Sequence, residues 1–189
     1  MATRRAEEGE QAATNGVIRP VRRIVTGEDA AGRSMIVSDG PAQNISAPAG
    51  GAIIGQVVWA TGAGAAPGDD PAPAGHPFGF HSEGGTILRI ADFAPDESCD
   101  VGQLHRFLDD SGVRDGADPR HFWFHKTASL DYAIVLDGEI YAMMDEGEVL
   151  MRAGDILIQR ATNHSWSNRS NAPCRMAFVL IALDDRPDV

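Results

Sequence analysis

The sequence has little positive charge, few cysteines and no long apolar run. Its 189 residues hold 16 Lys and Arg against 27 Asp and Glu, a formal net charge of −11. Nucleic acids and anionic membranes are bound through basic surfaces, so this balance argues against both as partners. No segment approaches the roughly 20 apolar residues of a membrane helix, and the polar N-terminus lacks the apolar stretch of a signal peptide. We expect a cytoplasmic protein whose partner is a small-molecule substrate.

The cysteine content excludes a disulfide framework. Cys99 and Cys174 stand alone, without the CxxC spacing of a zinc knuckle, and are expected to be reduced thiols. Turn-forming residues are abundant by contrast, with 21 Gly and 11 Pro. Many turns in a chain of this length favour short strands over a helical bundle.

Strand-like runs follow one another along most of the chain. Residues 1–16 lack periodicity and are predicted to be a disordered or docking arm, with a single domain over 17–189. Residues 100–113 carry apolar side chains at helical spacing, and residues 61–84 are a Gly- and Pro-rich loop. The strand runs are 21–25, 34–38, 52–60, 86–93, an antiparallel meander over 131–160, and 174–183. This pattern predicts an all-β barrel with one short helical insertion.

Histidines mark the candidate site. Alternation along a strand places two sets of side chains on inward faces: His121, Trp123, His125, Thr127 and Asp131, and then His164, Trp166 and Asn168. His125, Asp131 and His164 could supply two imidazoles and a carboxylate to a divalent ion. Asp131 could instead orient a histidine as a catalytic dyad, and the tryptophans could be plain core. Asn168 is expected to fix backbone at a strand end.

Other polar residues are assigned no firm role. His76 and His81 fall in the Gly- and Pro-rich loop and are expected to be exposed, as is His105 on the short helix. Arg89 and Arg160 could hold a carboxylate substrate, although an arginine on a strand is usually solvated. The sequence contains neither a P-loop nor a nucleophile elbow.

Two segments resemble the motifs of the cupin family. Residues 125–138 resemble the first motif, in which two His, a Glu and a Gly occur in order, and residues 154–168 resemble the second, which ends in a His and an Asn. The resemblance implies a double-stranded β-helix, or jelly-roll, barrel. It also implies one divalent transition metal, which could be Fe, Mn, Zn, Ni or Cu.

The departures from these motifs weaken the implied ligand set. Thr127 stands at the second His position, Asp131 replaces Glu, and Gln159 and Ala161 replace the Pro and Gly of the second motif. What remains is His125, Asp131 and His164, with His121 as a possible fourth ligand. Trp123, Thr127 and Trp166 are predicted to line the substrate pocket.

The resemblance supports three functions. The first is a metal-dependent enzyme acting on a small organic substrate, with the metal as Lewis acid or oxygen-activating centre, of dioxygenase, lyase or isomerase type. The second is a metal-free epimerase or isomerase with a His–Asp dyad. The third is a small-molecule-binding protein without catalysis. A homodimer is expected for all three.

Overall fold

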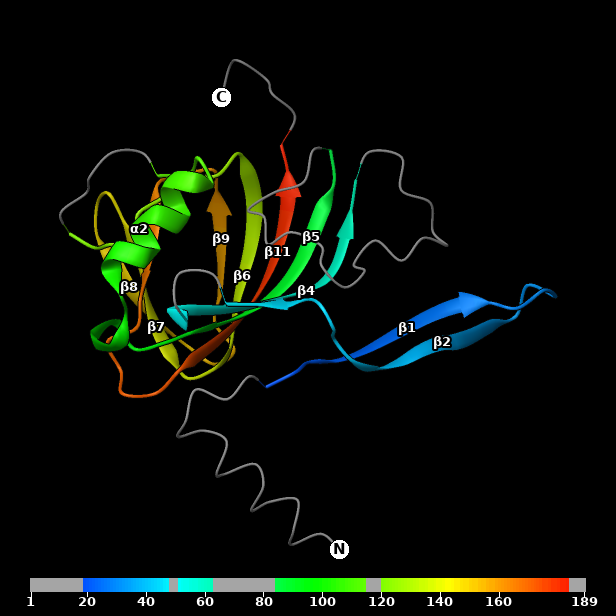
Figure 1. Cartoon of the computed structure of the whole chain (residues 1–189). Coiled ribbons are helices and arrows are strands. Elements are labelled where there is room, and N and C mark those ends of the chain that lie inside the picture. Colours follow the sequence, from blue (N-terminus) through cyan, green and yellow to red (C-terminus); the bar gives the residue numbers. More distant parts are fainter. Residues whose placement is uncertain (1–18, 48–50, 63–83, 115–119, 184–189) are drawn as a thin grey trace, which may run out of the picture.

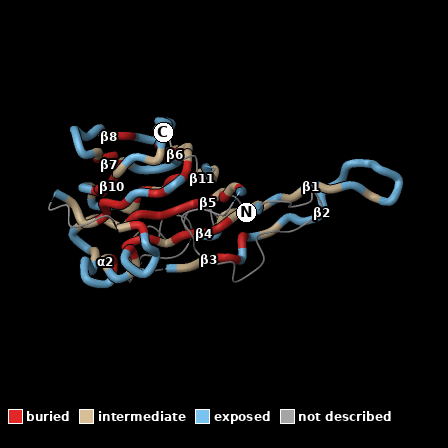
Figure 2. The backbone as a smooth tube through the Cα atoms, turned by 90° about the horizontal axis from the view of Figure 1, so that it is seen from above, coloured by how far each residue is buried: buried red, intermediate tan, exposed pale blue. Residues whose placement is uncertain are grey.

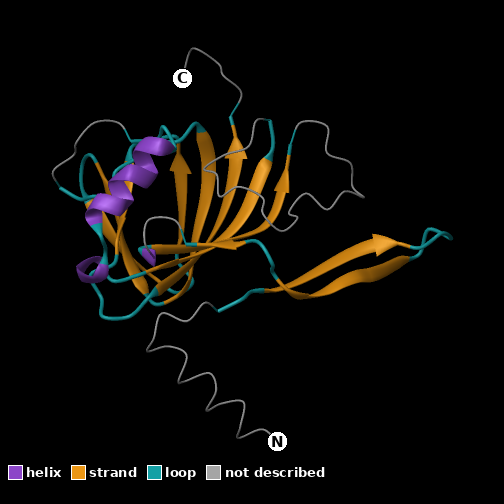
Figure 3. Ribbon diagram, in the orientation of Figure 1, coloured by secondary structure: helices purple, strands orange, loops and turns teal. Residues whose placement is uncertain are grey.

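This computed structural model describes residues 19–47, 51–62, 84–114 and 120–183. Strands make up most of this part of the chain, as Figure 3 shows, with one α-helix and one 3-10 helix between them. The elements in chain order are β1 (Arg22–Glu28), β2 (Ser34–Pro41), β3 (Ile45–Ser46), β4 (Ile53–Thr61), β5 (Thr86–Phe93), η3 (Asp96–Ser98), α2 (Val101–Asp110), β6 (Ser129–Asp137), β7 (Glu139–Met144), β8 (Glu148–Arg152), β9 (Ile156–Arg160), β10 (His164–Ser167) and β11 (Cys174–Ala182).

Two antiparallel sheets face each other and form the barrel (Figure 1). The larger has the order β3-β4-β5-β11-β6-β9, and the smaller has the order β10-β7-β8. The non-consecutive neighbours show that the chain passes repeatedly between the sheets, which is the jelly-roll arrangement that the sequence predicted.

The two sheets share one apolar core, in which the inward positions of each strand alternate with outward ones. Along β6 the burial alternates residue by residue from Ser129 to Val135, as expected for a strand with one face in a core. The tube in Figure 2 is buried along β5 and β11 and exposed at its periphery. Leu104 and Leu108 of α2 join this core at the side of the sheets, and Asp100 caps the helix by accepting a hydrogen bond from the Gln103 amide.

The meander predicted over 131–160 is wrong at two of its three turns, because β6 does not pair with β7 and β8 does not pair with β9. β6 pairs with β11 and β9, whereas β7 pairs with β8 and β10, so the chain leaves one sheet for the other at Gly138. Gly138 has a φ of 81°, and a Cβ there would lie 3.1 Å from the Pro173 carbonyl oxygen. The Asp-Gly pair therefore turns a corner of the barrel, since both edges of β6 are already occupied.

A two-stranded arm, β1 and β2, extends away from the barrel (Figure 1). Residues 1–16 and 63–83, which include the expected docking arm and most of the expected loop, lie outside the described residues, as do His76 and His81. None of the helices in the described ranges has the length and apolar character needed to cross a membrane.

Candidate functional site

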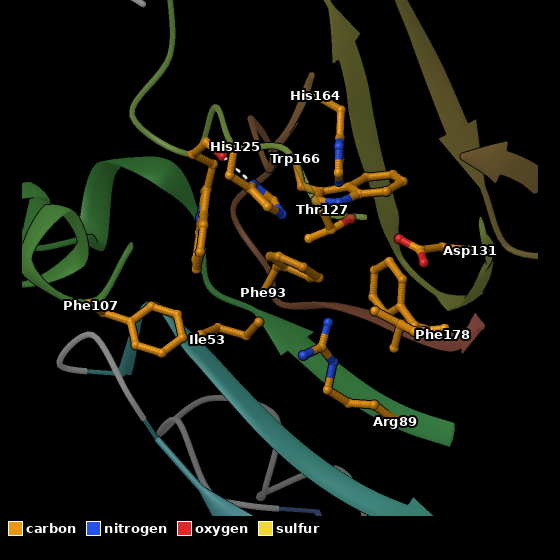
Figure 4. Close-up of a pocket in the computed structure, with 12 residues that line it drawn as sticks. Ile53, Arg89, Phe93, Phe107, His125, Thr127, Asp131, His164, Trp166 and Phe178 are labelled. Carbon is orange, nitrogen blue, oxygen red and sulfur yellow. Dashed lines mark hydrogen bonds between the residues drawn. The ribbon is translucent and has the colours of Figure 1, made fainter. Parts of the chain in front are cut away.

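A pocket of about 410 Å³, including its open mouth, lies between the two sheets. The side chains around it are mostly aromatic and aliphatic, with five polar ones among them, and Figure 4 shows how they converge. The lining residues are Ile53, Arg89, Phe93, Phe107, Trp123, His125, Thr127, Asp131, His164, Trp166, Phe178 and Leu180.

His125 and His164 lie side by side on the pocket wall. Their backbones exchange two hydrogen bonds, from the His125 amide to the His164 carbonyl (2.9 Å) and back (3.0 Å). This bridge extends the smaller sheet by one residue beyond β10 and brings the ring centroids to 4.3 Å. Two residues that are far apart in sequence are thus fixed relative to each other by backbone.

Each imidazole is held through Nδ1. His125 Nδ1 lies 2.6 Å from the Trp123 carbonyl oxygen, and His164 Nδ1 lies 2.9 Å from the Thr162 carbonyl oxygen. A carbonyl only accepts, so both Nδ1 atoms carry the hydrogen and donate it. Each Nε2 then keeps its lone pair, and Figure 4 shows both rings directed toward the pocket.

Burial keeps both rings neutral. It lowers the pKa of His164 to about 4, although the hydrogen bond to Thr162 opposes the shift. It also lowers the pKa of His125 well below its usual value, and the neighbouring His164 and Arg89 lower it further. The pocket therefore presents two unprotonated imidazole nitrogens at neutral pH.

Arg89 and Asp131 are the two charged residues of the pocket. Arg89 on β5 is 5% exposed, with its guanidinium carbon 5.5 Å from the centre of the Phe178 ring. Burial lowers the pKa of Arg89 to about 10, even though the Asp131 carboxylate on β6 raises it. The Asp131 carboxylate is thus an electrostatic partner of Arg89.

The side chains do not form a metal site as they stand. Among the described residues, no group of three His, Cys, Asp or Glu is arranged to hold a metal ion. His125, Asp131 and His164 line the same pocket, and the rings of His125 and His164 adjoin. Thr127 at the second His position accepts a hydrogen bond from the Ser129 hydroxyl (2.9 Å) and has no group suited to these metals. Of the three predicted ligands, His125 and His164 have adjoining rings, and these two residues would hold such a metal.

His121 lies elsewhere, in contrast to its expected place beside His125. Residues 120–124 form a turn instead of a strand, so the alternation that placed His121 inward does not apply. Its Nδ1 lies 2.6 Å from the Ser165 hydroxyl, and its Nε2 lies 3.1 Å from Asp96 Oδ2. Ser165 is fully buried, so this Ser–His–Asp arrangement is a structural link and has no access to a substrate.

Asn168 fixes backbone, as predicted. Its amide nitrogen donates to the Phe93 carbonyl (3.0 Å) and the Ala172 carbonyl (2.8 Å), and its oxygen accepts from the Ser170 amide. His105 lies on α2 away from the pocket lining. Cys99 and Cys174 are free thiols, and burial raises their pKa values to about 11 and about 12.

The pocket residues that the sequence left without a role lie on the larger sheet. Paired residues on neighbouring strands point to the same face of a sheet, and Arg89 of β5 pairs with Phe178 of β11. Both side chains therefore face inward, as does Phe93. The sequence does carry a signal for Arg89, because it has the same parity as Ile87, Ala91 and Phe93 and so lies on an otherwise apolar face of the strand. Phe107 reaches the pocket from α2, a placement that strand parity does not reveal.

Comparisons with known proteins found similarity to one family model and to several fungal proteins. Residues 113–181 match the family model described as Cupin domain. The chain is 37% identical over 107 residues to Phomopsin biosynthesis cluster protein C' of Diaporthe leptostromiformis, covering 56% of this chain and 44% of that protein. It is 35% identical over 111 residues to the cupin-domain-containing oxidoreductase fogC of Aspergillus ruber, covering 57% and 43%. The chain thus spans less than half the length of these curated relatives.

A longer match and two solved structures extend the comparison. The cupin-domain-containing oxidoreductase srdB of Neurospora crassa is 26% identical over 175 residues, covering 90% of this chain and 76% of that protein. The Cupin_2 domain of an XRE family transcriptional regulator from Enterobacter cloacae aligns with a TM-score of 0.35 at 12% identity, covering 52% of this chain and 83% of that one. A Cupin 2 conserved barrel domain protein from Salinispora arenicola aligns with a TM-score of 0.34 at 13% identity, covering 56% and 70%.

Proposed function

Because residues 113–181 form a cupin domain and place the chain in the cupin superfamily, we propose that the protein is an enzyme that transfers a proton on a small aromatic carbonyl compound. The relatives named cupin-domain-containing oxidoreductases support an enzyme-like function. The observation that carries the proposal is the pair of neutral imidazoles, His125 and His164, with both Nε2 lone pairs toward an aromatic pocket.

The proposed reaction uses the imidazoles as bases. One Nε2 takes a proton from the carbon next to the substrate carbonyl, and the electron pair of the broken C–H bond moves onto the carbonyl oxygen. The resulting enolate regains a proton from the imidazolium at a different face or position, which gives an isomer and restores the neutral ring. No other reactant is consumed.

Thr127 is placed to assist at the carbonyl oxygen. Its hydroxyl oxygen accepts from Ser129, which leaves the Thr127 proton available to donate into the pocket. A donor aimed at an oxygen that becomes negative stabilises the enolate more than the ketone. Thr127, which stands where the family motif has a metal-binding His, would thus donate a hydrogen bond to the substrate oxygen.

Hydrogen–deuterium exchange tests this proposal without knowledge of the natural substrate. The purified chain is incubated in D₂O with phenylacetone, a neutral aryl ketone, and separately with phenylpyruvate, its carboxylate counterpart. We expect exchange of the protons next to the carbonyl above the buffer rate for at least one probe. His125→Gln and His164→Gln should each lower the enzymatic rate by about 100-fold, the usual contribution of a positioned base.

Two controls sharpen the experiment. His105→Gln removes a histidine from α2 outside the pocket and should leave the exchange rate unchanged. Thr127→Val keeps the side-chain shape and should lower the rate by about tenfold or more through loss of one hydrogen bond. Buffer-level exchange of both probes, or a full rate in both glutamine variants, would refute the proposed proton transfer.

A divalent metal bound by His125 and His164 is the second candidate. It is favoured by one observation, since metal-ligating histidines usually donate their other ring hydrogen to a backbone carbonyl or carboxylate. Such a metal would supply a Lewis acid to the pocket. Metal analysis after reconstitution distinguishes the candidates: one equivalent in the parent chain that is lost in both glutamine variants, with activity abolished by chelation, would favour the metal enzyme.

A further inference from the structure

The larger sheet carries apolar side chains on its reverse side, away from the pocket. Inward and outward side chains alternate along each strand, so the chain neighbours of Arg89 and Asp131 point away from the pocket. Strand register aligns these outward side chains into rows that cross β4, β5, β11, β6 and β9. One row is Trp59, Leu88, Val179, Tyr132 and Ile158, and the adjacent row is Gln56, Ile90, Ala177, Ile134 and Ile156. These two rows make up the outer face of the larger sheet.

β6 and β11 lack the polar outward residues of a solvated sheet. A sheet that faces solvent on one side alternates apolar and polar residues along its strands. Outward positions are instead apolar from Leu130 to Leu136 in β6 and from Ala177 to Ile181 in β11. At the edge of the sheet, Ile156 and Ile158 of β9 have 62% and 51% of their surface exposed. The larger sheet therefore has the sequence pattern of a sheet that is buried on both faces.

Polar pairs border the outer face at both ends of its strands. At one end the Arg175 guanidinium donates two hydrogen bonds to the Asp92 carboxylate, at 2.7 and 2.6 Å. At the other end the hydroxyls of Thr61 and Thr86 share a hydrogen bond of 2.8 Å. An apolar centre within a polar rim is the usual anatomy of a protein–protein interface.

The rest of the chain has little apolar material with which to cover this face. Residues outside the described ranges include few large apolar side chains, namely Met1, Val17, Ile18, Phe78, Phe80 and Val189. A second copy of the chain, by contrast, offers an apolar face of the same size. All ten residues of the two rows are uncharged, so two acidic chains can meet here without bringing like charges into contact.

The arm formed by β1 and β2 begins beside the outer face. The Val21 amide donates to Gln56 Oε1 (2.8 Å), and the guanidinium carbon of Arg23 lies 5.2 Å from the centre of the Trp59 ring. Five strands about 4.8 Å apart, with about 20 Å of paired length, give a flat area of about 500 Å². A stable interface buries about 800 Å² on each partner. The exposed apolar side chains of the arm, Ile36 among them, can supply the difference.

We infer that two copies of the chain pair through their outer faces, and that the arm of each copy packs against the partner's barrel. Val179 and Tyr132, on the central strands of the outer face, lie in the middle of this contact. The inference does not depend on the proposed function, because the outer face and the pocket lie on opposite sides of the larger sheet.

Sedimentation velocity tests the pairing with a substitution on the outer face. The parent chain should sediment as a dimer at micromolar concentration. Ile158→Lys should raise the dimer dissociation constant at least about 100-fold, because two-fold symmetry buries the new charge twice. Val149→Lys is the matched control, since Val149 is 53% exposed on β8 of the smaller sheet, and it should leave the dissociation constant unchanged.

A milder substitution keeps the test decisive if the lysine disturbs the fold. Ile156→Thr combined with Ile158→Thr retains β-branched side chains, which suit a strand, and should give the circular dichroism of the parent chain. The loss of apolar contact should raise the dissociation constant at least about tenfold.

Isoleucine methyl spectra recorded with a soluble paramagnetic agent show what covers the outer face. The Ile134 methyl signal should resist broadening in the parent dimer and should broaden in the chain with Ile158→Lys. A parent dimer with a broadened Ile134 signal, or the parental dissociation constant in both folded variants, would overturn the inference. A monomeric parent chain would overturn it as well, and a protected Ile134 in that monomer would assign the cover to the same chain.

Discussion

The imidazole rings of His125 and His164 are oriented by hydrogen bonds to backbone carbonyls. Each Nδ1 is held by a carbonyl two residues earlier in the chain, that of Trp123 for His125 and that of Thr162 for His164. The carbonyl fixes the tautomer and the ring orientation together. The same local geometry at both positions explains why the two Nε2 atoms face one cavity.

The buried His164 predicts that stability depends on pH. Its folded pKa of about 4 lies below the unfolded value of about 6.5, so the unfolded chain binds the proton more readily between these values. The free energy of unfolding should therefore fall by about 3 kcal/mol as the pH drops from about 6.5 to about 4. Urea unfolding at a series of pH values measures this loss.

The control for this prediction is His164→Gln, in which the titrating ring is removed. Its pH profile should be flatter than that of the parent chain over the same window, with His125 contributing the remaining slope in the same direction. If the free energy of unfolding of the variant falls with pH as steeply as that of the parent chain, groups other than His164 cause the pH dependence.

At the scale of elements, Asp96 joins the segment before α2 to β10. It accepts hydrogen bonds from the Ser167 hydroxyl (2.7 Å), the Asn168 amide (3.0 Å) and His121 Nε2 (3.1 Å). Burial alone would raise the Asp96 pKa, but these hydrogen bonds and the nearby His121 outweigh it and lower the pKa. The link holds the helix that carries Phe107 against the strand that carries His164.

Asp96→Ala should therefore destabilise the fold by about 2 to 4 kcal/mol, because it leaves several buried donors without an acceptor. The matched control is Asp109→Ala on α2, which removes an exposed partner of Arg114 and should cost less than about 1 kcal/mol. Urea midpoints of the two variants give the comparison. Equal losses in both would contradict the assigned role of Asp96.

The sequence predicts elements well where local signals are strong. The runs at 34–38, 52–60, 86–93 and 174–183 correspond to β2, β4, β5 and β11, and 100–113 contains α2. The prediction was wrong at Gly138, where a hairpin was expected and the chain turns a barrel corner, and at His121, where a strand was expected and a turn is found. Both outcomes depend on neighbours that are distant in sequence. The pairing of His125 with His164 and the inward position of Arg89 depend on register, which a single sequence does not specify.

At the scale of the whole molecule, the arm formed by β1 and β2 differs from the barrel. Its two strands pair only with each other among the described strands, and Ile24, Met35, Ile36 and Val37 are each about half exposed. A two-stranded sheet is marginally stable by itself. Because apolar side chains are exposed on both strands, we propose the arm as part of the surface of the expected homodimer.

The expected homodimer can be tested on this arm. Ile24→Lys combined with Ile36→Lys should shift the chain toward monomer in sedimentation velocity, because charged side chains oppose burial of the arm. Val149→Lys on β8 places the same charge at an exposed apolar position of the barrel and should leave the sedimentation unchanged. A parent chain that sediments as a monomer would refute the homodimer.

The proposed proton transfer requires His125 and His164 to be neutral, with an unprotonated Nε2 in each ring. Long-range ¹H–¹⁵N correlation spectra of the histidine rings at neutral pH measure this directly. We expect a protonated Nδ1 and an unprotonated Nε2 for both residues, the reverse of the tautomer that free neutral histidine favours in water. An imidazolium, or a hydrogen on Nε2 of either ring, would contradict it.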